Sequence, residues 1–362
     1  MQSGRANVLV APLDWGLGHA TRCIPVIEKL LQKGCNVVLG GCGIGLDLLR
    51  ERYPTLDSEQ LPSYNITYPR KGSMTLHIAR QIPEIFRVIR EEKRMLDEIV
   101  SRRDLTHVIS DNRYGLHSEK VPSVIMTHQV HVSSGTKLSF IDHLLFLIHR
   151  NKLEQFDTIW IVDNPNDDRL AGDLSSSKGL RKPFQFTGLL SRFAIMPMHK
   201  EHEQHPDYTK VAILSGPEPQ RSLLEEKMKS FFMQSTERCL IVRGVGGKAK
   251  EKIANVDLFD SIDDQTLLAM LHPETTLYTR PGYSTLMDLA FITHTNTVFV
   301  PTPGQTEQEY LGLLMRNRFG YSCIHQDSFP KEHEVCHGKE LSPPSIQPLE
   351  DCVNMLLQMA VK

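Results

Sequence analysis

The stretch from Tyr278 to Tyr310 constrains the fold most, because it holds a strand, a turn, a helix, a second strand and a polar loop in direct succession. Pro281-Gly282 turns the chain after the first strand, and Ser284 or Thr285 can cap the helix that follows. The second strand, Asn296 to Val300, stops at a turn of Pro and Gly. Strands that alternate with helices in this way predict an α/β fold built on a parallel sheet.

The start of the chain repeats this arrangement. Ala6 to Ala11 has the pattern of a buried strand, a glycine-containing loop runs to His19, and the helix that follows stops at Gly34. A dinucleotide-binding loop would need a third glycine where Thr21 stands, and a carboxylate after the next strand, which ends in Gly40-Gly41 instead. The sequence therefore disfavours the binding of a nicotinamide dinucleotide.

Length and charge narrow the class of protein further. With 362 residues the chain is long enough for about two domains, and 41 Lys plus Arg against 43 Asp plus Glu leave a net charge of −2. This balance argues against a nucleic-acid binder, which needs a concentrated basic face. The polar start, Met1 to Asn7, is not typical of a signal peptide, and no apolar segment reaches the length of a membrane span. These features predict a cytoplasmic location.

The cysteines and histidines do not predict a metal site. None of the seven cysteines has the C-x-x-C spacing, and a reducing compartment is the simplest context for them. His333, Cys336 and His337 offer three ligands, but they lie in a charged, Pro-rich segment without a second pair of ligands. We interpret that segment as a solvated loop and expect neither a metal nor a cofactor.

The stretch that opens this section resembles the donor-sugar region of glycosyltransferase family 28, which includes the enzyme that adds N-acetylglucosamine to the lipid-linked peptidoglycan precursor. In that family an Arg/Ser-Gly turn, a helix with an acidic residue, and a Gln-rich loop ending in an aromatic residue hold the nucleotide-sugar. The matching positions in this chain are Arg280, Gly282, Ser284, Thr285, Asp288, Gln305, Gln308, Glu309 and Tyr310.

The resemblance implies the GT-B fold, an α/β architecture in which two Rossmann-like, doubly wound domains face each other across a cleft. It assigns an acceptor-binding domain to residues 1–192 and a nucleotide-sugar-binding domain to residues 193–345. Residues 346–362 would then form a helix that crosses back to the first domain.

Further donor contacts follow from the same resemblance. The turn at Gly216 precedes a helix whose N–H groups can bind phosphate, and Arg192, at the crossover between the domains, would reach the donor diphosphate. Phe259 and Ile262 belong to a stretch similar to the family's uracil-binding Phe-Ile-Asp-Asp sequence. Asp288 would hold the ribose. The sugar is assigned to three side chains: Gln305, Gln308 and Glu309.

His19 is the candidate catalytic base. A histidine near a helix N-terminus is favoured as the neutral imidazole, because the helix dipole disfavours the cation there. The alternative is a hydrogen bond within the loop. Family 28 enzymes carry a Gly-His loop after their first strand, which faces the acceptor. The acceptor contacts that the resemblance implies follow three strands: Asp14, Gly16, Gly18, Asp111, Asn112, Arg113, His128 and Gln129.

Residues 138–153 are apolar on most turns of a predicted helix and basic near the end. Such a helix can pack in a domain core or lie on a membrane surface, and its length favours the core. The inner face of the membrane is therefore retained only as a candidate contact surface.

The function predicted is an inverting, metal-independent transfer of a hexose from a UDP-sugar, with N-acetylglucosamine as the candidate sugar, to a hydroxyl of a sugar, lipid-linked or small-molecule acceptor. Two alternatives stay open. A UDP-sugar 2-epimerase of the same fold would rearrange the sugar without an acceptor, and a nucleotide-sugar-binding protein would bind without turnover.

Overall fold

The computed structural model describes residues 5–67, 69, 74–132, 139–165, 168–195, 208–329, 331, 334–341, 345 and 347–362, without the side chains of 74–76, 78, 79 and 139. His333 of the predicted solvated loop lies outside these residues. The chain forms two compact units, Met1–Ile66 with Ile78–Ile195 and Pro344–Lys362, and Thr67–His77 with Met196–Pro343.

Unit 1 is built on a parallel sheet of seven strands in the order β3-β2-β1-β4-β5-β6-β7. The strands are β1 Asn7–Pro12, β2 Asn36–Gly41, β3 Asp57–Gln60, β4 His107–Asp111, β5 Ser123–Thr127, β6 Thr158–Ile161 and β7 Phe184–Phe186. The helices are α1 Leu17–Gln32, α2 Gly43–Arg52, α3 Met74–Arg102, α4 Ser139–Leu153 and α9 Gln347–Gln358, with the short 3-10 helices η1 Gly172–Ser175 and η2 Arg192–Ile195.

Unit 2 has a second sheet of seven strands in the order β10-β11-β9-β8-β12-β13-β14, in which only β10 is antiparallel to its neighbour. The strands are β8 Lys210–Ile213, β9 Cys239–Val242, β10 Lys250–Ile253, β11 Val256–Phe259, β12 Thr276–Thr279, β13 Thr297–Phe299 and β14 Ser322–Cys323. The helices are α5 Gln220–Phe232, α6 Asp264–Met270, α7 Tyr283–Ile292 and α8 Thr306–Phe319, with the 3-10 helix η3 Gln326–Ser328.

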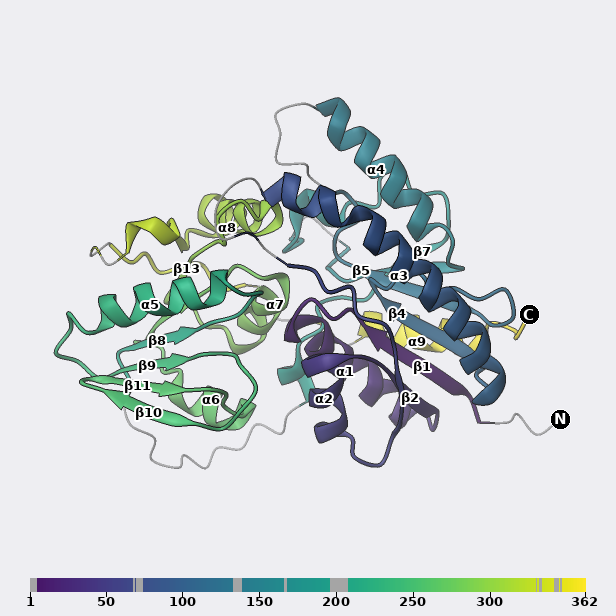
Figure 1. Ribbon diagram of the computed structural model, residues 1–362, viewed down its shortest axis with the longest axis horizontal. Coiled ribbons are helices and arrows are strands. Elements are labelled where there is room, and N and C mark those ends of the chain that lie inside the picture. Colours follow the sequence, from purple (N-terminus) through teal and green to yellow (C-terminus); the bar gives the residue numbers. More distant parts are fainter. Residues whose placement is uncertain are drawn as a thin grey trace. The chain divides into compact units, whose positions relative to one another are not determined.

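The core of each unit lies between its sheet and the helices that cover it (Figure 1). The central strands read as continuous apolar runs because both of their faces are covered. Val8, Leu9 and Val10 of β1 are fully buried, as are Leu240 and Ile241 of β9. Each sheet thus gives rigid support to the loops that leave its strands at their carboxyl ends.

Candidate functional site

In unit 1 the order of the strands reverses between β1 and β4, which lie side by side although α1, β2, α2, β3 and α3 separate them in sequence. Ligands of open α/β sheets bind outside the carboxyl ends of the strands at such a switch point. The loop after β1 leads to His19 in the first turn of α1, and β4 ends at Asp111. The topology therefore brings these two predicted residues together.

The imidazole of His19 is held by two charged side chains. Its Nδ1 lies 3.0 Å from Oδ2 of Asp111 and 2.9 Å from Nη2 of Arg22. Arg22 also donates from Nε to Oδ2 of Asp111 at 2.7 Å, and its Nη2 donates to Oδ1. Among the described residues none hydrogen-bonds to Nε2 of His19, whose side chain is 15% exposed. The ring is thus fixed through one nitrogen.

Charge and burial set the protonation of this cluster. Burial disfavours the ionised carboxylate of Asp111, but the charges of Arg22 and His19 outweigh it and hold the pKa of Asp111 well below its usual range. Burial also lowers the pKa of His19; Asp111 opposes this shift and Arg22 adds to it. At neutral pH the cluster therefore contains an ionised Asp111 and a neutral His19. This state supports the predicted preference of His19 for the neutral form.

Sequence reasoning missed Arg22, which is 2% exposed and links most of this cluster. Its Nη1 lies 2.9 Å from Nδ1 of His128. With the amide of Asn112 oriented for hydrogen bonding, its Oδ1 accepts from Nη2 of Arg22 at 3.2 Å. The available signal was spacing, because Arg22 follows His19 by three positions and so lies on the same helix face.

The other predicted acceptor residues follow the strands β1 and β5. Gly16 adopts φ +103 at the N-cap of α1, a conformation that L side chains rarely adopt, and Gly18 accepts from the hydroxyl of Thr21. Gln129 is placed just beyond β5, where its N–H donates to Oγ1 of Thr127. Asp14 accepts from the N–H of Tyr64 at 3.2 Å.

Arg113 is fully buried, and its contacts are those of a structural residue. Its Nε donates to the carbonyl of Pro12 at 2.7 Å, and its Nη1 donates to the carbonyl of Pro62 and to Oε1 of Glu92 at 2.9 and 2.8 Å. Because the guanidinium joins the loops after β1 and β4 to α3 in this way, we leave Arg113 out of the residues proposed to contact an acceptor.

Unit 2 has its own switch point, between β8 and β12. The helices α5, α7 and α8 begin in loops at this edge of the sheet, and their first turns differ in charge. The first turn of α5 is internally bonded: Ser222 N–H donates to Oε2 of Glu218 at 3.3 Å, and Leu223 N–H donates to the carbonyl of Pro219 at 3.0 Å. Gly216, at which the phosphate-binding turn is predicted, lies ahead of this helix and has φ +101.

The N-terminus of helix α7 is a further candidate site for an anion. Gly282 is its N-cap, and no acidic residue lies in its first turn. By contrast, α8 carries Glu307 and Glu309 in its first turn, where they already complement the positive end of the helix dipole. Ser284, Thr285 and Asp288 lie within the first two turns of α7 and are partly exposed.

Arg280, which immediately follows β12, is a buried cation without a carboxylate partner among the described residues. Its Nη1 donates to the carbonyl of Val300 at 2.8 Å, and its Nη2 donates to the carbonyl of Gln220 at 3.1 Å and to Oε1 of Gln326 at 2.6 Å. Its Nε is buried without a hydrogen-bond partner in the described part of the chain. Burial lowers the pKa of Arg280 to about 9, so it stays cationic at neutral pH.

The predicted sugar-binding loop is organised by its own side chains. Oε1 of Gln308 accepts from the N–H of Thr302 at 2.9 Å, and Oε1 of Glu309 accepts from the N–H of Gly304 at 2.7 Å. The side chain of Gln305 caps α8 by accepting from the N–H of Gln308. These bonds fix the loop between β13 and α8, while the side chains concerned stay partly exposed.

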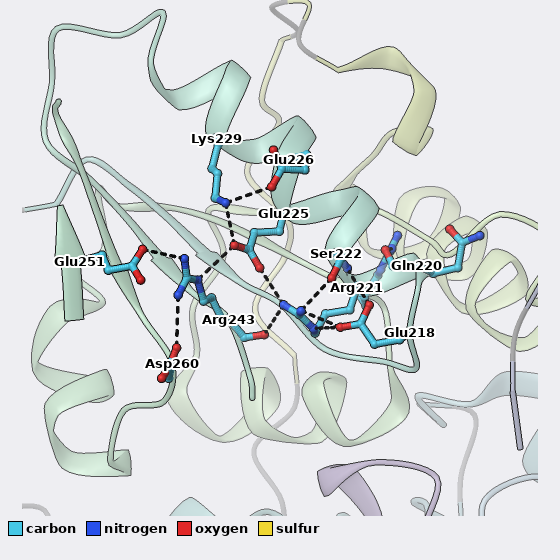
Figure 2. A network of polar contacts seen from close by, with 11 residues as sticks. Glu218, Gln220, Arg221, Ser222, Glu225, Glu226, Lys229, Arg243, Glu251 and Asp260 are labelled. Carbon is cyan, nitrogen blue, oxygen red and sulfur yellow. Dashed lines mark hydrogen bonds and ion pairs between the residues drawn. The ribbon is translucent and has the colours of Figure 1, made fainter. Parts of the chain in front are cut away.

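A network of ion pairs joins α5 to the ends of β9 and β11 (Figure 2). Arg243, just after β9, donates from Nε to Glu225 of α5 at 3.0 Å, and its Nη1 and Nη2 reach Asp260 at 3.3 Å and Glu251 at 3.0 Å. Arg221 pairs with the other oxygen of Glu225 at 2.8 Å. The network fixes the glycine-rich loop beyond Arg243 relative to the segment after β11.

The predicted base-binding segment follows β11. Phe259 ends this strand and is partly exposed, and Nζ of Lys250 lies 4.8 Å from the centroid of its ring. Ile262 is partly exposed, and Asp263 caps α6 by accepting from Thr266 N–H at 2.9 Å. The predicted donor residue Arg192 belongs to unit 1, where its guanidinium lies 5.0 Å from the ring centroid of Phe193.

In the part of the chain that the structure describes, no three His, Cys, Asp or Glu side chains gather as a metal site. Across the same residues, no helix combines the length and apolarity needed to cross a bilayer.

Comparison with solved structures places the fold. No protein-family model matches the sequence, and no curated protein matches it significantly. The glycosyltransferase SnogD from Streptomyces nogalater aligns with a TM-score of 0.53 at 14% identity, over 91% of this chain and 88% of that chain. UGT89C1 of Arabidopsis thaliana, in complex with UDP-L-rhamnose, aligns with a TM-score of 0.56 at 14% identity, over 100% of this chain and 91% of that chain. The spinosyn forosaminyltransferase SpnP aligns with a TM-score of 0.57 at 12% identity, over 98% of this chain and 90% of that chain. The predicted GT-B type of α/β fold is confirmed.

Proposed function

We propose that this protein is a glycosyltransferase that moves a sugar from a UDP-sugar to an acceptor hydroxyl. The observation that carries the proposal is the contact of His19 with Asp111 at the switch point of unit 1. A buried carboxylate that holds one nitrogen of a neutral imidazole leaves the other nitrogen to accept a proton. The GT-B fold supports the same class of reaction.

His19 acts as the general base in this proposal. Its Nδ1–H donates to Asp111, and Nε2 takes the proton of the acceptor hydroxyl as the oxygen attacks the anomeric carbon. The bond from that carbon to the UDP oxygen breaks, and the configuration inverts. The carboxylate of Asp111 stabilises the imidazolium that forms, while Arg22 keeps Asp111 ionised.

Unit 2 holds the donor. The start of α7 offers backbone N–H groups and no acidic side chain to a diphosphate, and the cation of Arg280 lacks a carboxylate among the described residues. These two features support charge compensation of the UDP leaving group without a metal. Asp288 is assigned to the ribose hydroxyls, and Gln305, Gln308 and Glu309 to the sugar.

UDP is the proposed nucleotide on two grounds. The segment from Phe259 to Tyr310 resembles the donor region of family 28, and one of the similar structures was determined with UDP-L-rhamnose. We keep N-acetylglucosamine as the first sugar to test. The acceptor is proposed to be a sugar, lipid-linked or small molecule that carries a hydroxyl.

Mass spectrometry of the products tests this function. The protein is incubated with UDP-N-acetylglucosamine and other UDP-sugars, with and without a pool of hydroxyl acceptors. The proposal expects UDP release and an acceptor that gains one sugar mass, both lost in His19→Ala. An isomeric UDP-sugar formed without acceptor would identify an epimerase instead. Tight UDP binding without any product would identify a binding protein.

A further inference from the structure

One nitrogen of His19 faces a hydrogen-bond donor and an acceptor at the same time. Its Nδ1 lies 3.0 Å from Oδ2 of Asp111, which only accepts while it is ionised. The same Nδ1 lies 2.9 Å from Nη2 of Arg22, which only donates. A neutral imidazole carries its proton on one of its two nitrogens, so Nδ1 satisfies one of these neighbours and not both. The two choices are the two tautomers of His19.

Only one of these tautomers can act as the proposed base. With the proton on Nδ1, the ring donates to Asp111 and leaves Nε2 free to accept. With the proton on Nε2, Nδ1 accepts from Arg22, and Nε2 cannot take a proton from an acceptor hydroxyl. A hydrogen bond from Arg22 to His19 therefore opposes the proposed chemistry.

The outcome depends on where Nη2 of Arg22 places its two hydrogens. One of them goes to Oδ1 of Asp111. The other reaches either Nδ1 of His19, at 2.9 Å, or Oδ1 of Asn112, at 3.2 Å. The remaining nitrogens of the guanidinium donate elsewhere: Nε to Oδ2 of Asp111 and Nη1 to Nδ1 of His128. Asn112 is thus the acceptor that competes with His19 for the second hydrogen of Nη2.

The surroundings of Asn112 fix its amide in the orientation that this competition requires. Its Nδ2 donates to the carbonyl of Met126 at 3.2 Å and to Oγ1 of Thr127 at 3.0 Å, both in β5. With both amide hydrogens used there, Oδ1 faces Nη2 of Arg22. The residue is 9% exposed, and its φ of 56 lies in the left-handed region, which asparagine tolerates better than most residues.

We propose that Asn112 is a positioning residue that keeps His19 in the tautomer with its proton on Nδ1. By accepting the second hydrogen of Nη2, Oδ1 of Asn112 leaves Nδ1 of His19 free to donate to Asp111. Asn112 acts through Arg22, a role different from the acceptor contact that the sequence predicted. The inference rests on the proposed function, because the tautomer matters for catalysis only if His19 is the base.

Nitrogen NMR of protein with isotope-labelled histidine tests the proposal without any substrate, because the shifts of the two ring nitrogens identify the tautomer. Spectra are recorded at about pH 8, well above the ordinary pKa of histidine. The signals of His19 and of His128 are those that disappear in His19→Gln and in His128→Gln. We expect the proton of His19 on Nδ1. His128 is the internal reference with its proton on Nε2, because its Nδ1 accepts from Arg22.

Asn112→Gly removes the amide without straining a backbone at φ 56. We expect the population of the Nδ1–H tautomer of His19 to fall about tenfold, as the loss of one hydrogen bond allows. The value of kcat should fall by the same factor, while KM for the UDP-sugar stays unchanged because the donor is assigned to unit 2. Asn112→Asp keeps an oxygen that accepts from Nη2, and it should retain the wild-type tautomer.

Asp104→Gly is the matched control. Asp104 also has a left-handed backbone, with φ 47, but it precedes β4 and so lies at the end of that strand away from Asp111. This variant should match the wild type in both the tautomer of His19 and kcat.

Two results would overturn the proposal. One is a wild-type protein in which His19 carries its proton on Nε2. The other is an Asn112→Gly protein, shown to be folded by circular dichroism and melting temperature, in which His19 keeps the wild-type tautomer. Failure of the proposed function is a separate result: if the spectra are as expected but the wild type releases no UDP with any donor and acceptor, the tautomer assignment stands and the role of His19 as base is wrong.

Discussion

Nδ1 of His19 lies 3.0 Å from Oδ2 of Asp111, although 92 positions separate the two residues in sequence. The contact exists because β1 and β4 are neighbours in the sheet, so that the loop after one strand meets the end of the other. Arg22 holds the same carboxylate at 2.7 Å. A ring oriented by a buried carboxylate is the feature on which the proposed chemistry depends.

Replacing His19 with Ala removes the proposed base. We expect kcat to fall by about 10²- to 10⁴-fold, the usual contribution of a positioned general base. The affinity for UDP should not change, because the donor is assigned to unit 2. Initial rates of UDP release and UDP titrations of both proteins check this. A variant that keeps the wild-type kcat would remove His19 from the mechanism.

The pH dependence of kcat/KM follows from the pKa of His19. Because burial lowers this pKa below its ordinary value of 6.5, the neutral base persists on acidification, and the rate should decline only below that pH. The charge of Asp111 raises the pKa of His19, so Asp111→Asn should move the decline to still lower pH. The maximal rate should also drop, since the imidazolium loses its stabilising partner. An acid limb that moves upward would contradict the assignment.

Arg22→Met should destabilise the fold by about 3–5 kcal/mol at neutral pH, because it leaves the buried Asp111 without its cation. The pKa of Asp111 is lowered in the folded state, so its contacts stabilise the protein above the ordinary value of 3.8 and this stability is lost as the pH falls through the folded value. Urea unfolding of both proteins at pH 7 and in acid measures the difference, which should shrink in acid. Equal losses of unfolding free energy at both pH values would indicate that Arg22 stabilises the fold through packing and not through its charge.

The sequence predicted the fold and several residues of the candidate site. Alternating strands and helices, with Gly- and Pro-containing turns between them, are local patterns and were sufficient for both sheets. His19 was identified for the same reason, because a Gly-His loop at a helix start is a local signal. β10 was missed, since Lys250 to Ile253 is an exposed edge strand without apolar alternation.

Long-range partners were harder to predict. Asp111 was expected to contact the acceptor, and its pairing with His19 became visible only from the order of strands in the sheet. Arg22 resembles any polar residue of an amphipathic helix until its burial is known. Arg113 and Arg280 lie in loops at strand ends, where exposed residues are common, yet both are 0% exposed and bonded to backbone carbonyls.

Arg280→Met should weaken UDP binding although the guanidinium is buried. The cation is not offset by a carboxylate in the described part of the chain, so a diphosphate in unit 2 would supply the missing charge. We expect a loss of about tenfold in affinity, or about 1.4 kcal/mol. Lys252→Met, which removes a cation from the exposed strand β10, serves as control and should bind UDP normally. Scanning fluorimetry measures the rise in melting temperature that UDP causes and so compares UDP binding by the two variants with that of the wild type.

Calorimetric titration with UDP, UDP-N-acetylglucosamine and NADH decides whether this chain binds a nucleotide-sugar, and it does not require the acceptor to be known. We expect that both uridine ligands bind the wild type, that NADH does not, and that Asp288→Ala weakens uridine binding about tenfold or more through the lost contacts to the ribose. Binding of NADH without binding of either uridine ligand would contradict this expectation.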